Sequence, residues 1–182
     1  RGQLGEPVRL NLGCGLDVRD GWFNYDPDPT HHTVSQWQAG EDLLFASGEV
    51  DHIEVRHVLE HIPHSINEET WFGFWEECWR VLKVGGTIRC ISPMHDSEWA
   101  WGDPGHCRAI HPYVFWFLSA DFYEHNAEGG SPASHYRPRC NFLSDLALER
   151  HGEKETPMYR VDTIIANLTK EPLPEWYEEM LK

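Results

Sequence analysis

Two glycines follow one apolar run, and an aspartate ends the next, in the segment VRLNLGCGLDVRDGWFNYDPDP from Val8 to Pro29. The run from Val8 to Cys14 predicts a buried strand, and the aromatic run from Trp22 to Tyr25 predicts a short second strand that ends at Asp26. A glycine turn lets a ligand approach the backbone closely, because no side chain blocks it. The pattern therefore points to a ligand held between the ends of two strands.

The residues at these strand ends suit a nucleoside. In an open α/β sheet, ligands bind beyond the carboxyl ends of the strands. Gly13 and Gly15 supply the turn, and Asp26 can accept two hydrogen bonds from a ribose diol, with Asp28 as the alternative acid. An ordinary turn with a surface aspartate would show the same residues, because a lone G-x-G pattern is weakly specific.

A dinucleotide fits this pattern poorly. The fingerprint G-x-G-x-x-G requires a third small residue for close packing of helix and strand, and Val18 occupies that position. The acid also follows sooner than the roughly 20 residues expected after the glycines. The sequence therefore favours a nucleoside without a pyrophosphate.

The following segments alternate between strand and helix patterns. Val50 to Val58 predicts a third strand, Ser65 to Leu82 a helix, and Thr87 to Ser92 the next strand, with Gly85-Gly86 ending the helical segment. Ser65 to Glu68 fits a capping box at the start of that helix. Strand, helix and strand in this order predict an α/β fold, a Rossmann-like and mostly parallel sheet with flanking helices.

The C-terminal part differs in pattern. Asn141 to Glu149 and Tyr159 to Lys170 are extended-looking runs, which predict an antiparallel strand pair that closes the sheet. A helix is the alternative for the first run, because Leu143, Leu146 and Ala147 also fit the helical period.

Length and charge limit the class of protein. A chain of 182 residues predicts a single domain, and its net charge of -15 disfavours a nucleic-acid partner or an anionic membrane surface. A neutral or cationic small molecule is the favoured partner. Five scattered cysteines without a C-x-x-C pair indicate reduced thiols, and the sequence shows no membrane-spanning run or signal peptide. We therefore expect a cytoplasmic protein, whose oligomeric state the sequence leaves open.

Four segments resemble, in the same order, the class I S-adenosylmethionine-dependent methyltransferases: LNLGCG, GWFNYDPDP, EDLLFASGEVDHIEVRHVLEHIP and WEECWRVLKVGGTIRCISP. The resemblance runs from Val8 to about Pro93. LEHI and RVLKVGG are similar to the small-molecule branch, including enzymes found with saccharide biosynthesis. WGDPGHCRAIHPYVF resembles a segment that follows the fifth strand in such proteins. The resemblance implies S-adenosylmethionine as cofactor and a single methyltransferase domain, residues 1–182, with a substrate-side insertion at about 94–139.

The resemblance also implies roles for individual residues. The matching positions are Leu12, Gly13, Cys14 and Gly15 beside the methionine part of the cofactor, Asp26 at the ribose, Asp42 with Leu43 near the adenine amino group, Arg56 and His57 where cofactor and substrate meet, and Glu60 and His61 in the turn after them. The stretch between Asp26 and Asp42 is short for the family. The helix and third strand usually found there must be reduced, which bears on the position of Asp42.

Methyl transfer from a sulfonium is a direct displacement that depends mainly on alignment of the reacting atoms. An oxygen or protonated nitrogen acceptor also needs a base, and imidazole suits this near neutral pH. His57 is the first choice for the base and His106 the second, whereas the other candidates are His95, Asp96 and Asp103. For each of these residues, a surface or hydrogen-bonded loop side chain is the competing interpretation.

The remaining patterns argue against a metal and leave two other classes open. His106, Cys107 and His111 are close in sequence, but no paired C-x-x-C or H-E-x-x-H motif accompanies them, so we expect no metal. A nucleic-acid or protein methyltransferase and a non-catalytic cofactor-binding module remain alternatives. Two sets of tryptophans are expected to differ: Trp71, Trp75 and Trp79 in the core, and Trp99, Trp101 and Trp116 along a substrate cleft.

Overall fold

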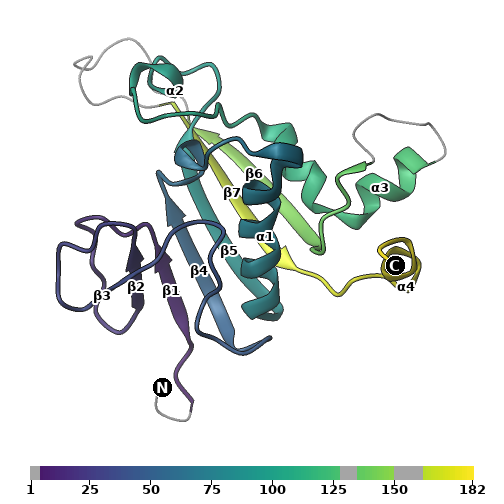
Figure 1. Cartoon of the computed structure of the whole chain (residues 1–182), viewed down its shortest axis with the longest axis horizontal. Coiled ribbons are helices and arrows are strands. Elements are labelled where there is room, and N and C mark those ends of the chain that lie inside the picture. The colour runs from purple at the N-terminus through teal and green to yellow at the C-terminus, as the bar shows by residue number, and fades with distance from the viewer. Residues whose placement is uncertain (1–4, 128–134, 150–161) are drawn as a thin grey trace.

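The computed structural model describes residues 5–127, 135–149 and 162–182, and within them the chain forms one seven-stranded sheet (Figure 1). The strand order is β3-β2-β1-β4-β5-β7-β6. The strands are β1 Arg9–Leu12, β2 Phe23–Asp26, β3 Val34–Gln36, β4 Val50–Arg56, β5 Leu82–Pro93, β6 Phe142–Glu149 and β7 Thr163–Lys170. The first five pair in parallel, and β7 pairs antiparallel with both β5 and β6. This confirms the predicted Rossmann-like sheet and its C-terminal antiparallel pair.

Helices and 3-10 turns connect these strands. The α-helices are α1 Glu69–Val81, α2 Trp99–Gly102, α3 Ala120–Ala127 and α4 Glu175–Met180, and the 3-10 helices are η1 Leu59–His61, η2 Ile66–Glu68 and η3 Pro112–Leu118. Figure 1 shows α1 lying across one face of the sheet and α2 beyond one end of the strands. The segment around α2 therefore stands over the strand ends at which ligands bind in this kind of sheet.

The crossover from β1 to β2 contains no helix in the part of the chain that the structure describes. Two buried asparagines hold it instead. Asn11 Nδ2 donates to Asn24 Oδ1 at 3.1 Å and to the Asp17 carbonyl at 2.7 Å, whereas Asn24 Nδ2 donates to the carbonyls of Arg19 and Trp22 at 2.9 and 3.1 Å. The side chains thus satisfy backbone groups that a helix would satisfy internally.

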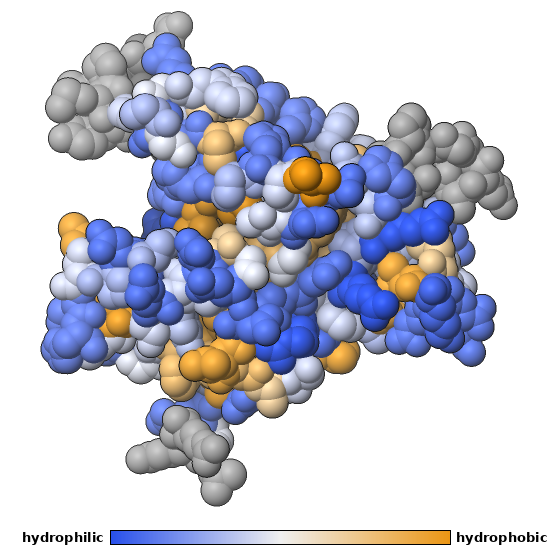
Figure 2. Space-filling view, viewed as in Figure 1, coloured by the Kyte–Doolittle hydropathy of each residue, from blue (hydrophilic) through white to orange (hydrophobic). Residues whose placement is uncertain are grey.

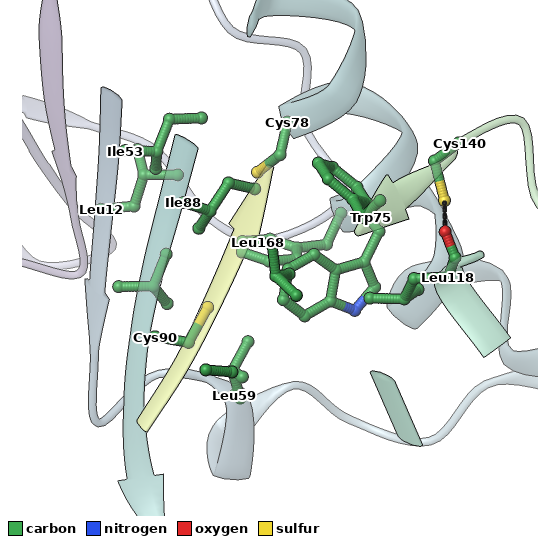
Figure 3. Close-up of a cluster of buried hydrophobic side chains, with 14 of the residues drawn as sticks. Leu12, Ile53, Leu59, Trp75, Cys78, Ile88, Cys90, Leu118, Cys140 and Leu168 are labelled. Carbon is green, nitrogen blue, oxygen red and sulfur yellow. Dashed lines mark hydrogen bonds between the residues drawn. The ribbon is translucent and has the colours of Figure 1, made fainter. Parts of the chain in front are cut away.

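The main core lies between α1 and the sheet. Trp71, Phe74, Trp75 and Cys78 are buried on one side of α1, as their helical spacing predicts, and Trp79 is partly buried against the same core. Figure 3 shows Trp75 among side chains from several other elements, including Leu59, Ile88, Leu118 and Leu168. The three tryptophans of α1 are therefore core residues, as expected.

The start of α1 differs from its predicted form. No capping box forms, because Asn67 and Glu68 both have positive φ angles, 55° and 57°. The Ser65 hydroxyl instead accepts a hydrogen bond from the Thr70 N–H at 2.9 Å. The Glu68 carboxylate lies 2.6 Å from Arg108 Nη2, so an ion pair with a distant segment occupies the group that the capping box requires.

The run from Asn141 to Glu149 forms strand β6, Phe142–Glu149, so the strand prediction is confirmed and the helical alternative is wrong. Two other boundaries differ from prediction. Strand β5 begins at Leu82, so Gly85 and Gly86 fall inside it, where the pairing with β4 shifts register. The last predicted strand is observed from Thr163, and residues 159–161 of that prediction lie outside the described residues.

Figure 2 shows a mostly hydrophilic face on which apolar residues gather in separate groups. Among the described helices, none has the length and apolar character needed to cross a membrane. The five cysteines are unpaired, and burial raises the pKa of the Cys78, Cys90 and Cys140 thiols.

The packing of α1 predicts a large effect of truncation at Trp75. Trp75→Ala should lower the free energy of unfolding by about 3–5 kcal/mol, because the indole is fully buried and its loss leaves a cavity. Trp101→Ala is the matched control. Its side chain is 64% exposed, and the change should stay within about 0.5 kcal/mol. Urea denaturation measures both, and similar losses in the two variants would contradict the assignment of Trp75 to the core.

Candidate functional site

A cavity of about 690 Å³ lies where β1, β2 and β4 end. The chain adds β2 and β3 on one side of β1, and β4 and β5 on its other side, so the strand order reverses between β1 and β4. Such a switch point is where ligands bind in open α/β folds. The residues lining the cavity are Asn11, Gly13, Cys14, Gly15, Leu16, Asp17, Asp26, Pro27, Arg56, His57, Val58 and His61. The strand-end residues singled out in the sequence therefore meet at one site.

Gly13 and Gly15 form the turn after β1 with positive φ angles of 67° and 50°. A Cβ on Gly13 would overlap Cγ2 of Val58, which comes from the turn after β4. A Cβ on Gly15 would meet open space. The turn itself is tied to the neighbouring strand, because the Cys14 N–H donates to the Tyr25 carbonyl at 3.0 Å. Packing against Val58 thus requires a glycine at position 13, whereas the space beside Gly15 is unoccupied by described residues.

The carboxylate of Asp26 faces the same turn. Its Oδ2 accepts a hydrogen bond from the Gly15 N–H at 2.8 Å, and its Oδ1 accepts one from the Asp28 N–H at 3.0 Å. A carboxylate can accept about four hydrogen bonds, so each oxygen keeps capacity for a ligand hydroxyl. Asp28 contributes its backbone to this arrangement and does not line the cavity.

Cys14 lies between the two glycines as a neutral thiol. Burial raises its pKa, and the nearby carboxylate of Asp26 raises it further. The thiolate is the nucleophilic form of cysteine, so this residue is suited to packing against a ligand and not to covalent chemistry.

His57 follows the last residue of β4 and has a positive φ angle of 54°. Its backbone N–H donates to the Ile91 carbonyl at 2.8 Å, which fixes the turn to β5. Its Nδ1 lies 3.3 Å from Glu60 Oε1, and the Glu60 side chain is buried whereas that of His57 is 49% exposed. A buried carboxylate therefore orients an imidazole ring whose other side faces the cavity.

Four residues matched by the resemblance lie outside the cavity lining: Leu12, Asp42, Leu43 and Glu60, the last of which contacts His57 from behind. Leu12 is fully buried in β1. Asp42 is exposed, and Leu43 belongs to the core, with its N–H donating to Glu77 Oε1 at 2.6 Å. The structure therefore brings Gly13, Cys14, Gly15, Asp26 and His57 together and places Leu12, Asp42 and Leu43 apart from them.

His106 lies behind the cavity and contacts it through His61. The two rings meet edge to face with centroids 4.7 Å apart. Asp103 Oδ2 is 4.0 Å from His106 Nε2, whereas the His95 ring lies against His111 with centroids 4.3 Å apart. His106 thus packs against His61, a residue that lines the cavity, whereas His95 belongs to a separate cluster of rings.

The tryptophans expected along a cleft lie elsewhere. Trp99 and Trp101 are exposed and do not line the large cavity, whereas Trp116 lines a second hollow of about 340 Å³ beside α3. Sequence reasoning gave no site role to Asn11, Leu16, Asp17, Pro27 and Val58, all of which line the large cavity. The one available signal was Asn11, a polar residue between two leucines in β1.

Comparison with known proteins gives a family match and a shared fold. Residues 25–90 match the model of a family described as a methyltransferase domain. No curated protein matches the chain in sequence.

Several solved structures share the fold at low sequence identity. An S-adenosylmethionine-dependent methyltransferase from Archaeoglobus fulgidus matches with a TM-score of 0.59 and 14% identity over 91% of this chain and 87% of that chain. One from Methanosarcina mazei gives a TM-score of 0.57 and 12% identity over 90% and 92% of the two chains. A putative S-adenosylmethionine-dependent methyltransferase from Listeria monocytogenes gives 0.53 and 11% over 91% and 92%.

The overlap at Gly13 predicts a measurable coupling with Val58. Gly13→Ala should lower the free energy of unfolding by about 1–3 kcal/mol through its positive φ angle and the overlap with Val58. Gly15→Ala carries the same backbone penalty without the overlap and serves as the control. In urea denaturation, the double variant Gly13→Ala, Val58→Ala should be at least about 0.5 kcal/mol more stable than the sum of the two single effects predicts. The double variant Gly15→Ala, Val58→Ala should show additive effects. Additive effects at both glycines would exclude this contact.

Proposed function

We propose that the chain is an S-adenosylmethionine-dependent methyltransferase that methylates a small-molecule acceptor, a saccharide or another metabolite. The family match over residues 25–90 and the fold shared with S-adenosylmethionine-dependent methyltransferases support this proposal. The observation that carries this proposal is the cavity at the ends of β1, β2 and β4, which combines a glycine turn, a ribose-binding acid and an oriented imidazole. Its volume of about 690 Å³ lies in the usual range for small-ligand sites.

The residues of the cavity fit the cofactor. Gly13 and Gly15 expose backbone to the methionine part, and Asp26 keeps hydrogen-bonding capacity for the ribose hydroxyls after its two backbone contacts. The neutral Cys14 thiol supplies an uncharged wall beside them. Asp42 and Leu43 lie outside the cavity, so we assign the adenine end to the neighbourhood of Pro27, which lines both the large cavity and an adjoining hollow.

S-adenosylmethionine would supply a methyl group on a sulfonium. A suitably aligned nucleophile would attack the methyl carbon as the carbon–sulfur bond breaks, and the neutral thioether would leave. His57 is the proposed base, because its ring lines the cavity and Glu60 holds its Nδ1 side. With the proton on Nδ1, the Nε2 atom carries the lone pair that accepts a proton from the acceptor. Glu60 positions this ring through its contact with Nδ1.

We assign acceptor selection to the segment after β5, residues 94–139, as an insertion within a single domain. Its described part is fixed to the turn after β4, since the Cys107 N–H donates to the Glu60 carbonyl at 3.0 Å. Arg108 Nε also donates to the Ile62 carbonyl at 3.2 Å. The net charge of -15 favours a neutral or cationic acceptor over a polyanion.

Transfer of a labelled methyl group tests the acceptor class. The purified chain, incubated with labelled S-adenosylmethionine, should label neutral saccharides or small amines in a metabolite pool and leave RNA, DNA and protein unlabelled. Label appearing only in a macromolecule would overturn the small-molecule proposal. Cofactor binding without any transfer would point to a non-catalytic module.

Removal of the ribose-binding acid should weaken cofactor binding selectively. Asp26→Ala should reduce affinity for S-adenosylmethionine by about 1–3 kcal/mol, the scale of charge-assisted hydrogen bonds. Asp28→Ala is the control, because it retains the backbone N–H that contacts Asp26. Calorimetry measures both affinities. Loss of binding in Asp28→Ala with an unchanged Asp26→Ala would reverse the assignment.

Replacement of His57 should slow turnover more than it weakens cofactor binding. Asn tolerates a positive φ angle, so His57→Asn retains the backbone turn while removing the base. We expect kcat to fall by about 10²–10⁴-fold, the usual contribution of a general base. His64→Asn, at a 60% exposed side chain outside the cavity, should retain parent turnover. Equal kcat values in the two variants would exclude His57 as the base.

A further inference from the structure

His61 and His106 come together at the edge of the cavity from two different segments. His61 ends the η1 turn after β4, and His106 follows α2 in the segment after β5. Their rings meet edge to face with centroids 4.7 Å apart. The His106 side chain is only 7% exposed, whereas His61 reaches the cavity lining.

Hydrogen bonds orient both rings in the same way. His61 Nδ1 lies 3.1 Å from the Gly105 carbonyl oxygen, and His106 Nδ1 lies 3.3 Å from the Ala100 carbonyl oxygen. A carbonyl oxygen only accepts hydrogen bonds, so each Nδ1 carries the proton and each neutral ring keeps its lone pair on Nε2. Histidines that bind metals usually donate their other ring N–H to a carbonyl or carboxylate in this manner.

Glu60 completes the group with a buried carboxylate. The residue is 1% exposed, and its Oε1 contacts His57 Nδ1 at 3.3 Å. Its Oε2 is buried and has no hydrogen-bond partner among the described residues. Burial of a carboxylate oxygen without a partner is costly, so this atom needs a ligand that the described residues do not supply. One donor atom each from Glu60, His61 and His106 lie within 4.8 Å of one another.

We propose that Glu60, His61 and His106 bind a divalent transition-metal ion, of which Zn²⁺ fits best. Two imidazole nitrogens select such ions over Mg²⁺ and Ca²⁺, which prefer oxygen ligands. The unpartnered Oε2 atom is the carboxylate ligand. Asp103, whose Oδ2 lies 4.0 Å from His106 Nε2, places a further oxygen donor nearby.

The site adjoins the methyl-transfer cavity because His61 belongs to both. Three protein ligands leave a tetrahedral ion with one open position, as in catalytic zinc sites. An acceptor hydroxyl bound there would lose its proton more readily, and His57 is the neighbouring base. This role rests on the proposed function and specifies a hydroxyl-bearing acceptor; the binding of the ion does not depend on it.

Titration of the untagged chain, freed of metal by a chelator, tests the site. We expect one equivalent of Zn²⁺ to bind by calorimetry and Co²⁺ to give the visible absorption of a four- or five-coordinate ion. Glu60→Gln and His106→Ala should each weaken binding by about 100-fold or more, beyond the 10–100-fold that outer-shell changes cost. The double variant His31→Ala, His32→Ala removes an adjacent ring pair elsewhere and should bind as the parent does.

Thermal unfolding separates loss of the site from loss of the fold. Zn²⁺ should raise the Tm of the parent and of the His31, His32 control but not that of His106→Ala, because an ion that binds only the folded state stabilises it. Absence of a stoichiometric site, or parent-like binding by His106→Ala, would overturn the proposal. S-adenosylmethionine binding, measured by calorimetry on the metal-free chain, reports the cofactor part of the proposed function independently of that result. Methyl transfer, measured with and without Zn²⁺, reports whether the ion takes part in the reaction.

Discussion

The packing of the turn after β1 against the turn after β4 is the constraint on which the site depends. Val58 occupies the space that a Cβ on Gly13 would fill, so the Val58 side chain packs directly on the backbone of the turn after β1. His57 lies beside this contact with a positive φ angle of its own. A positive φ angle at a residue other than glycine costs free energy, which contacts in the surrounding structure must offset. The hydrogen bond from the His57 N–H to the Ile91 carbonyl is one such contact. Tight packing thereby fixes both the glycine turn and His57 at one cavity.

The short crossover between β1 and β2 explains why the acid follows the glycines so closely. A helix at this point would lengthen the connection and carry Asp26 further along the sequence. Here the Asn11–Asn24 pair closes the crossover with side-chain hydrogen bonds, and Asp26 reaches the Gly15 N–H directly. The short spacing between the glycines and Asp26, which argues against a dinucleotide, thus arises because side-chain hydrogen bonds replace a helix in this crossover.

The strand ends and the α1 helix were predictable because their signals are local: apolar runs, a helical spacing of tryptophans, and turn glycines. The features of the structure that differ from the sequence-based prediction depend on contacts between residues far apart in the sequence. Glu68 forms an ion pair with Arg108, 40 positions away, instead of capping its own helix. Leu43 turns into the core because Glu77 binds its backbone N–H. Neither contact has a signature within its own segment, and the same holds for the meeting of His61 with His106.

The segment after β5 and the turn after β4 behave as one structural unit. Arg108 joins them by three contacts of different kinds: a hydrogen bond to the Ile62 carbonyl, an ion pair with Glu68, and its guanidinium carbon 4.5 Å from the Trp71 ring centre. The Cys107 N–H binds the Glu60 carbonyl, so the backbone of the residue that orients His57 is itself held by this segment. In the proposed function, a change in the segment after β5 would therefore also move His57, the proposed base, and the histidine pair. Acceptor specificity and catalytic geometry would then be coupled, because the same few hydrogen bonds support both.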